Sequence, residues 1–385
     1  MNKNIAFIYS RYFPFGGGVA NAAKSLAEAL AKEGNKVTFY TIHSGRSTLS
    51  SRQIIAGVHI DRIRIPSIVF KVLRVKSEEK KIKMIGTLIG LYILLTRRKH
   101  DIFIGHNLQW GGIIASIVGV INKIPSAAMT HGEDVNQLTG FPRKEMLTKF
   151  ALKRLTYCFV LNTDFAKILQ KYHDQIYFRL PNILNISQRE ILSETVIKKR
   201  HNRGNLKLLC IGRFERSNKG VEIKGFSTAI AAMELLPENF HLEIIGDGVA
   251  RGDYEKLIKE KKLSGRVHLS GALEYSEAQR RMWNSSLLLM PSNLEGLGMV
   301  MLESMSKGIP VIATNIEGPK EYIKSGSNGF LIEPSDSAMM VEYIQCLSRS
   351  FQIYKKISLA SKQTYSENFT EKIVVDNFYK YLGWV

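Results

Sequence analysis

Short apolar runs alternate with helix-length segments from one end of the chain to the other. This alternation is typical of parallel sheets with helices wound on both faces. In the first half the expected strands are Ile5–Tyr9, Lys36–Thr41, Ile102–Gly105, Ser126–Met129 and Cys158–Leu161, and the expected helices are Ala20–Glu33, Ile82–Arg97, Gly111–Asn122 and Lys144–Leu155. In the second half the expected strands are Leu206–Ile211, His241–Ile245, Val267–Leu269, Ser286–Met290, Val311–Ala313 and Gly329–Leu331, and the expected helices are Lys224–Leu235, Tyr254–Lys262, Met299–Lys307 and Ala338–Ser348. The pattern predicts an α/β fold with doubly wound parallel sheets.

A polar and basic segment, residues 186–205, interrupts this alternation before a new strand opens. The chain has 385 residues, which is more than one hydrophobic core usually supports. We therefore expect two facing Rossmann-like domains with a cleft between them, formed by residues 1–185 and 186–365. Residues 366–385 are expected to form a C-terminal helix that packs back on the first domain.

The chain carries 54 lysine and arginine residues against 34 aspartate and glutamate residues, a net charge of +20. Such a charge favours an anionic partner, and nucleic acid, anionic lipid and a diphosphate substrate all fit. Basic residues flank the apolar stretch Met84–Leu95; they are Lys71, Arg74, Lys76, Lys80, Lys81 and Lys83 before it, and Arg97, Arg98 and Lys99 after it. Basic ends around an apolar helix suggest a membrane surface, and a core helix with solvated ends is the alternative.

The apolar stretch is too short to span a bilayer, which takes ~20 residues. No signal-peptide pattern is visible at the N-terminus. The three cysteines, Cys158, Cys210 and Cys346, are odd in number and widely separated, so they predict neither a disulfide framework nor a metal site. We expect a cytoplasmic protein, with possible peripheral contact with the inner face of the membrane.

The segment Pro291–Glu303 is the strongest candidate site. A short apolar strand ends there in a glycine-spaced turn that leads into a helix starting at Met299. A helix N-terminus offers N–H groups and a positive dipole end to phosphate, and the flanking Glu295 and Glu303 can accept hydrogen bonds from hydroxyls. Phosphate and hydroxyls together indicate a sugar nucleotide. The alternative is an ordinary packed helix with Glu303 exposed on it.

Two loops that follow expected strands could also meet phosphate. Gly16, Gly17 and Gly18 precede the first helix, where consecutive glycines let the backbone approach a ligand, although the dinucleotide fingerprint fails because its third glycine is absent. Arg213 and Lys219 follow the first strand of the second half, where a guanidinium fork and a point charge could neutralise a diphosphate. A flexible loop and a solvated basic loop are the respective alternatives.

A third loop, Met129–Asp134, places His131 directly after a strand. A lone histidine at such a place is more often structural than catalytic. The neighbouring Gly132 allows close approach and the adjacent acids add hydroxyl acceptors, so His131 is taken as a candidate site residue. His106 could equally be a core residue or part of a cleft floor.

Together these motifs resemble those of the retaining glycosyltransferases of family four, which have the GT-B architecture. Four motifs follow in the order and spacing of that family: G-R-F…K-G at Gly212–Gly220, G-D-G at Gly246–Gly248, P-S-N-L-E-G-L-G at Pro291–Gly298, and E-S-M-S-K-G-I-P-V at Glu303–Val311. The resemblance covers nearly the whole chain and is strongest in the second domain. Two positions depart from the commoner pattern: Ile183 follows Pro-Asn where glycine is usual, and Leu297 replaces a frequent aromatic residue.

The resemblance implies a role for each matching residue. Arg213 and Lys219 match the pair that grips the donor diphosphate, and Glu303 matches the acid that binds the ribose hydroxyls. Glu295 matches the acid that holds the transferred sugar, and His131 the histidine near its reactive face. The remaining donor-binding positions are Gly16, Gly17, Gly18, Gly296, Leu297, Gly298, Met299 and Val300.

The implied activity is metal-independent, retaining transfer of a hexose-type sugar from a nucleoside diphosphate, with no cofactor. The acceptor would be a hydroxyl of a glycan or a lipid-linked precursor of the lipopolysaccharide or surface polysaccharide type. Alternatives are a nucleotide-sugar epimerase or hydrolase of similar shape, and a basic nucleic-acid-binding protein. We expect no nucleic-acid partner, because the chain shows neither an RNA-binding aromatic run nor zinc-finger spacing.

Overall fold

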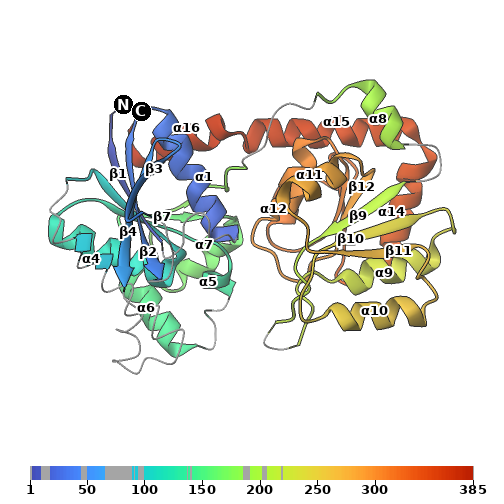
Figure 1. Ribbon diagram of the computed structural model, residues 1–385, viewed down its shortest axis with the longest axis horizontal. Coiled ribbons are helices and arrows are strands. Elements are labelled where there is room, and N and C mark those ends of the chain that lie inside the picture. The colour runs from blue at the N-terminus through green and yellow to red at the C-terminus, as the bar shows by residue number, and fades with distance from the viewer. Residues whose placement is uncertain are drawn as a thin grey trace. The chain divides into compact units, whose positions relative to one another are not determined.

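The computed structural model describes residues 2–9, 18–44, 50–65, 89–90, 92–93, 99–136, 138, 141–184, 191–201, 206–217 and 220–384. The chain divides into two compact units (Figure 1). The first unit is Met1–Ile183 together with Glu371–Val385, and the second unit is Leu184–Thr370. Each unit contains one twisted sheet with its own hydrophobic core. Two α/β units with mainly parallel sheets confirm the predicted fold class.

The first unit is built on an eight-stranded sheet. In sheet order its strands are β3 (Arg52–Ile55), β4 (Val58–Ile65), β2 (Lys36–Ser44), β1 (Asn4–Ile8), β5 (Ile102–His106), β6 (Ser126–Met129), β7 (Tyr157–Val160) and β8 (Tyr177–Arg179). The central strands were predicted from their apolar runs. The expectation of purely parallel sheets is wrong at one edge, because β3 pairs antiparallel with β4. Ala56 and Gly57 form the hairpin turn with φ of 47° and 80°, as a type I′ turn requires.

Helices lie on both faces of this sheet (Figure 1). They are α1 (Gly18–Lys32), the π-helical turn η1 (Asn107–Gly112), α4 (Ile113–Asn122), α5 (Glu133–Asn136), α6 (Pro142–Leu152), α7 (Thr163–Gln170) and α16 (Glu371–Leu382). The helix expected over Ile82–Arg97 lies mostly outside the described residues. The last helix, α16, packs into this core: Phe378 is fully buried, and its ring centroid lies 5.5 Å from that of Phe159. The C-terminal segment therefore completes the first unit.

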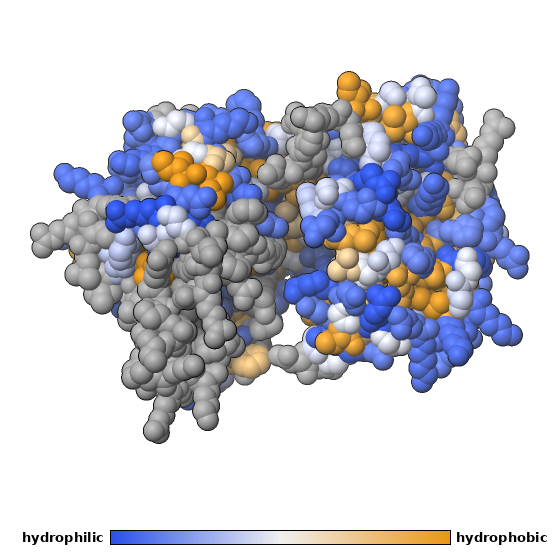
Figure 2. Space-filling model, viewed as in Figure 1, coloured by the Kyte–Doolittle hydropathy of each residue, from blue (hydrophilic) through white to orange (hydrophobic). Residues whose placement is uncertain are grey.

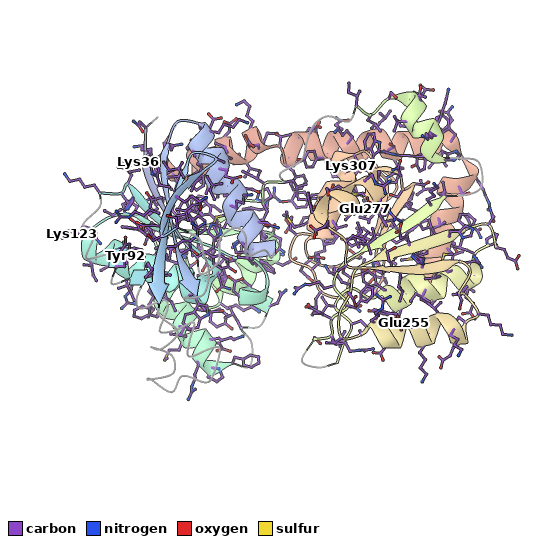
Figure 3. The ribbon with its side chains drawn as sticks, in the orientation of Figure 1. Lys36, Tyr92, Lys123, Glu255, Glu277 and Lys307 are labelled. Carbon is purple, nitrogen blue, oxygen red and sulfur yellow. The ribbon has the colours of Figure 1, made fainter. Side chains whose placement is uncertain are left out.

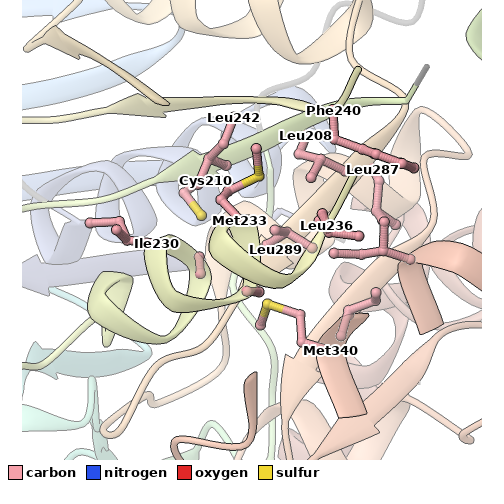
Figure 4. Packing of buried hydrophobic residues seen from close by; sticks show 14 of the residues in the cluster. Leu208, Cys210, Ile230, Met233, Leu236, Phe240, Leu242, Leu287, Leu289 and Met340 are labelled. Carbon is pink, nitrogen blue, oxygen red and sulfur yellow. The ribbon is translucent and has the colours of Figure 1, made fainter. Parts of the chain in front are cut away.

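The second unit contains a six-stranded sheet that is parallel throughout. In sheet order its strands are β11 (Val267–Gly271), β10 (His241–Ile245), β9 (Lys207–Ile211), β12 (Leu287–Met290), β13 (Val311–Thr314) and β14 (Phe330–Ile332). Its helices are α8 (Glu194–His201), α9 (Phe226–Leu235), α10 (Arg251–Glu260), α11 (Tyr275–Trp283), α12 (Met299–Ser306), α13 (Pro319–Tyr322), α14 (Ser337–Arg349) and α15 (Phe351–Asn368). Figure 4 shows the core between sheet and helices, where leucines of β9, β10 and β12 meet Met233 of α9 and Met340 of α14.

Helix α8 forms within the polar segment in which the sequence shows no strand. Arg200 of α8 donates from Nε to the Trp283 carbonyl oxygen at 3.1 Å and from Nη1 to that of Lys307 at 2.8 Å. Its guanidinium also lies 4.2 Å from the centroid of the Trp283 ring. A buried arginine needs such partners, and these bonds tie α8 to the ends of α11 and α12.

Three strands of the second sheet end side by side at its carboxyl edge. After β9 and β10, the Gly212 N–H donates to the Ile245 carbonyl oxygen at 3.0 Å, and the Phe214 N–H donates to that of Asp247 at 2.9 Å. Gly246, with φ of 150°, lies so close that an added Cβ would stand 1.8 Å from the Gly212 carbonyl oxygen. Glycine is needed here because both the space and the backbone angle exclude a side chain.

No described helix is both long and apolar enough to cross a membrane. Hydrophilic residues cover much of the visible face of the second unit, with hydrophobic residues between them (Figure 2). Single exposed apolar side chains are ordinary on such a surface. An interaction site is indicated only where several of them gather on one helix or strand.

Replacing Gly246 with alanine is expected to destabilise the second unit by about 2–4 kcal/mol, because the new Cβ meets backbone and the φ angle is unfavourable. Gly252 of α10 is the matched control: no atom lies within 4 Å of its added Cβ, so Gly252→Ala should change stability by less than about 1 kcal/mol. Urea unfolding of the two variants measures both values, and equal midpoints would contradict the role of Gly246.

Candidate functional site

The segment after β12 forms the loop and helix start that the sequence predicts. β12 is fully buried and ends before Pro291, and α12 begins at Met299. Gly298 caps this helix with φ of 84°, a conformation that glycine adopts without strain. The N-terminus of α12 therefore opens at the carboxyl edge of the sheet, where parallel sheets bind ligands.

The loop before α12 can meet a ligand mainly through its backbone. Leu297 is only 2% exposed, so its side chain belongs to the core and any ligand contact at this position comes from its main chain. Gly318 packs against the same loop, since its added Cβ would lie 2.5 Å from the Gly296 carbonyl oxygen. Gly296 lies in this loop, and Met299 and Val300 are the first two residues of α12.

Glu303 is held by two side chains of the neighbouring helix α11. Gln279 donates from Nε2 to one carboxylate oxygen at 2.8 Å, and the Tyr275 hydroxyl donates to the other at 3.3 Å. Burial raises the pKa of Glu303, and these hydrogen bonds oppose that rise by favouring the charged form. The alternative of a freely exposed helix acid is wrong, because Glu303 is largely enclosed by these partners.

Neither Tyr275 nor Gln279 was predicted from the sequence, because the helix that carries them was not expected. The sequence does contain one indication of them: Tyr275 and Gln279 are four residues apart, and residues with this spacing lie on one face of a helix. Together they present a carboxylate whose oxygens can still accept further hydrogen bonds, since each carboxylate oxygen has two lone pairs.

Glu295 forms an ion pair with a lysine that the sequence analysis did not single out. Lys224 Nζ lies 2.6 Å from Glu295 Oε2, and both side chains are mostly buried, at 22% and 15% exposure. The aliphatic stem of Lys224 covers Gly212, whose added Cβ would lie 3.0–3.2 Å from three of its carbons. Lys219, the predicted lysine, lies outside the described residues.

Gly225 fixes where Lys224 stands. It caps α9 with φ of 59°, and an added Cβ would lie 2.1 Å from the Pro291 carbonyl oxygen. The strand-to-helix loop of β9 and the loop of β12 therefore touch at this glycine. That contact holds Lys224 beside Glu295.

Arg213 has a different environment. Its side chain is 80% exposed, and its Nη1 lies 2.8 Å from Glu215 Oε1. An exposed pair of this kind contributes little to stability. Arg213 follows β9 directly, at the same edge of the sheet as Lys224, so an anion there could replace Glu215 as its partner.

In the first unit, His131 follows β6 and contacts His106 at the end of β5. Their Nδ1 (His106) and Nε2 (His131) atoms are 2.9 Å apart, and the ring centroids are 5.1 Å apart. Burial lowers the pKa of His131 to about 3, and burial together with the neighbouring His131 lowers the pKa of His106. Both rings are therefore neutral near pH 7.

Asp134 anchors the loop that carries His131. Its carboxylate accepts backbone N–H donors from Leu108 at 2.8 Å, His131 at 2.9 Å and Gly132 at 3.1 Å. Gly132 adopts φ of 103°, which lets the chain turn there. Of the predicted glycine loop, Gly16 and Gly17 lie outside the described residues, and Gly18 begins α1.

Within the described ranges, no three His, Cys, Asp or Glu side chains gather as a metal site would require. The candidate site of the second unit thus consists of a lysine, an arginine, two glutamates and a helix N-terminus.

Residues 193–364 match the family described as Glycosyl transferases group 1. The second unit is a domain of this family. Among curated relatives, the lipopolysaccharide core biosynthesis glycosyltransferase LpsE of Rhizobium meliloti is 29% identical over 176 residues, which is 46% of this chain and 49% of that protein. An uncharacterized glycosyltransferase of Methanocaldococcus jannaschii, MJ1178, is 28% identical over 77% of this chain and 80% of its own length. The chain thus spans about half the length of LpsE and most of MJ1178.

Solved structures resemble the chain over its whole length. HepE of Anabaena, in complex with UDP, has a TM-score of 0.77 at 16% identity and covers 99% of this chain and 100% of its own. Sucrose-phosphate synthase of Thermosynechococcus elongatus has a TM-score of 0.74 at 18% identity, with 99% of both chains covered. These similarities show the fold, and together with the group 1 domain they confirm the predicted resemblance to GT-B glycosyltransferases.

Replacing Lys224 with alanine is expected to weaken binding of a nucleoside diphosphate by at least about tenfold, because a charge-assisted hydrogen bond contributes about 1.5–3 kcal/mol. The loss also leaves Glu295 unpaired beside the anion. Thermal shift and calorimetric titration with UDP, GDP and ADP measure the effect.

Lys219→Ala tests the lysine predicted from the sequence, and Lys256→Ala, an exposed lysine in the middle of α10, is the control. A loss of affinity in Lys219→Ala that Lys224→Ala does not share would show that the sequence-based choice was right and Lys224 is structural.

Proposed function

We propose that this protein is a retaining glycosyltransferase that moves a sugar from a nucleoside-diphosphate sugar to a hydroxyl of a glycan or lipid-linked acceptor, in surface polysaccharide or glycolipid synthesis. The observation that carries the proposal is the group of Lys224, Glu295 and Glu303 around the start of α12, within a group 1 domain. The named lipopolysaccharide role of LpsE and the UDP bound to HepE support the same function.

Each group in the second unit would have one task. Lys224 and Arg213 would neutralise the diphosphate, together with the N-terminus of α12. Glu303 would accept hydrogen bonds from the ribose hydroxyls, because Gln279 and Tyr275 orient it. Glu295 would accept from a hydroxyl of the transferred sugar. Cations and dipoles that stand in place before the reaction can each stabilise the leaving diphosphate by several kcal/mol.

The transfer itself would proceed on one face of the sugar. The acceptor oxygen forms a bond to the anomeric carbon while the bond from that carbon to the diphosphate oxygen breaks, and the acceptor proton passes to the leaving diphosphate. Configuration is then retained without a carboxylate nucleophile. Lysine, arginine and the helix dipole would supply the positive charge, so no metal ion would be required.

Incubation of the purified chain with UDP-, GDP- and ADP-sugars tests this proposal. The expected product is free or transferred sugar with the anomeric configuration of the donor, formed equally well with EDTA, and Glu295→Gln should lower the rate at least about 100-fold. Conversion to a different nucleotide sugar with the diphosphate intact would instead identify an epimerase. Steeply salt-dependent binding to RNA or DNA without stabilisation by any nucleotide would point to a nucleic-acid-binding protein.

We also propose that the first unit contacts an anionic membrane surface. Helix α4 exposes Ile117, Val120 and Ile121, which share one helix face, and the neighbouring α6 exposes Met146. The same two helices carry exposed basic residues: Lys123 at the end of α4 (labelled in Figure 3), and Arg143 and Lys149 of α6. Apolar side chains inserted among cations are the usual means by which a protein binds the headgroup region.

Cosedimentation with vesicles that contain anionic lipid is expected at low salt and should decrease as salt rises. Ile121→Ser should reduce the bound fraction several-fold, whereas Val249→Ser, at a still more exposed position of the second unit, should not. If the wild-type chain stays in the supernatant at low salt, the membrane proposal is wrong and the sugar-transfer proposal is unaffected.

A further inference from the structure

Two histidines of the first unit, His106 and His131, are joined by a hydrogen bond between their rings. His106 ends β5, His131 follows the adjacent strand β6, and the ring planes are within 17° of parallel. His106 Nδ1 and His131 Nε2, 2.9 Å apart, form a hydrogen bond only if one of them carries a proton and the other does not. Two neutral arrangements satisfy this condition. Either His106 donates from Nδ1, or His131 donates from Nε2.

The surroundings of His106 distinguish these arrangements. Its side chain is completely buried, and its Nε2 atom has no hydrogen-bond partner in the described part of the chain. The ring stacks on Phe7, with 5.4 Å between centroids, and Tyr9 meets it edge-on. If His131 donated, the proton of His106 would sit on Nε2 and leave a buried N–H without an acceptor. Orphaned N–H groups of this kind are rare in folded proteins.

If His106 donates instead, its Nε2 carries only a lone pair among aromatic rings. His131 then accepts at Nε2 and keeps its own proton on Nδ1. The carboxylate of Asp134, three residues after His131, accepts backbone N–H groups from Leu108, His131 and Gly132. The burial that lowers both pKa values keeps the pair neutral.

We propose that His106 is a positioning residue that donates its Nδ1–H to His131 Nε2 and thereby makes the Nδ1–H of His131 a hydrogen-bond donor toward the reacting ligand. This inference rests on the proposed function and on the resemblance to family four, which implies that His131 lies near the reactive face of the transferred sugar. A donor at Nδ1 can hold a sugar hydroxyl or a phosphate oxygen. It cannot remove the proton of the acceptor, so His131 is not a general base.

Nitrogen NMR of the chain labelled with ¹⁵N-histidine tests the tautomers without reference to activity. The sequence holds nine histidines, and His131→Asn and His106→Asn assign the two signals. At pH 7 we expect protonated Nδ1 and unprotonated Nε2 in both rings. A protonated Nε2 in His131, an imidazolium, or averaged shifts at the two nitrogens of either ring would each overturn the proposal.

Kinetics of two variants test the consequence. His106→Leu removes the donor, so kcat/KM for sugar transfer should fall by about tenfold, the equivalent of one hydrogen bond, while UDP affinity stays as in the wild type. His106→Asn places an amide N–H near the lost Nδ1–H and should restore most of the rate. Loss of rate in both variants alike would assign His106 a packing role and overturn the proposal.

The two proposals fail in different ways. If the tautomers are as expected but His131→Ala transfers sugar at the wild-type rate, the role of His131 in the proposed function is wrong and the donor relationship between the rings stands. Should His106→Leu unfold at lower temperature, the ¹⁵N pattern of the wild-type chain still decides the tautomer.

Discussion

The contact between two loops at the carboxyl edge of the second sheet is the constraint on which the candidate site depends. Gly225 admits the Pro291 carbonyl oxygen because it has no Cβ, and Gly246 admits the Gly212 carbonyl oxygen for the same reason. These approaches bring the ends of β9, β10 and β12 together. Lys224 then has one position available, with its stem over Gly212 and its ammonium group on Glu295. The close approaches at Gly225 and Gly246 therefore determine where the charged groups of Lys224 and Glu295 lie.

A mostly buried ion pair such as Lys224 and Glu295 is weak evidence for stability, because taking two charges out of water offsets much of their attraction. Its retention makes more sense as preparation for a ligand. A diphosphate would meet an ammonium group that is already mostly removed from water, and a sugar hydroxyl would meet a carboxylate that is already oriented. Glu303 is similar, since burial raises its pKa, while the hydrogen bond of Gln279, the charge of Lys307 and the hydrogen bond of Tyr275 favour its ionised form. Both carboxylates are thus held by neighbouring side chains in orientations from which they could bind a ligand.

The sequence predicts the central strands and misses the periphery, for physical reasons. Strands such as β5 and β12 are buried along their whole length and their sequences are rich in apolar residues, whereas β3 begins with the exposed pair Arg52-Gln53 and has no such run. Helix α8 escapes detection because its polar surface dominates its composition, although Ile197, Arg200 and His201 are buried. Pairing between distant residues, such as that of His106 with His131, depends on strand order, and one sequence does not contain that information.

The lysine expected to bind the diphosphate is a second example of what one sequence leaves open. Two Lys-Gly pairs follow β9, and spacing from Arg213 favours the first, whereas only the second precedes helix α9 directly. Gly225 caps α9 and touches the loop of β12, which places Lys224 beside Glu295, whereas Lys219 lies outside the described residues and stays a prediction.

Lys224 and Arg213 would therefore serve a diphosphate in different ways. The lysine is fixed by burial and stands ready before any ligand arrives. The arginine is exposed and paired with Glu215, so it must exchange one oxygen partner for another when the anion binds. Exchange between exposed partners has a small energy cost, since the surface pair contributes little. A site with one fixed cation, Lys224, and one cation that changes its partner, Arg213, could both hold the donor and release the nucleoside diphosphate after transfer. Glu215 stays beside Arg213 and would pair with it again as the product leaves.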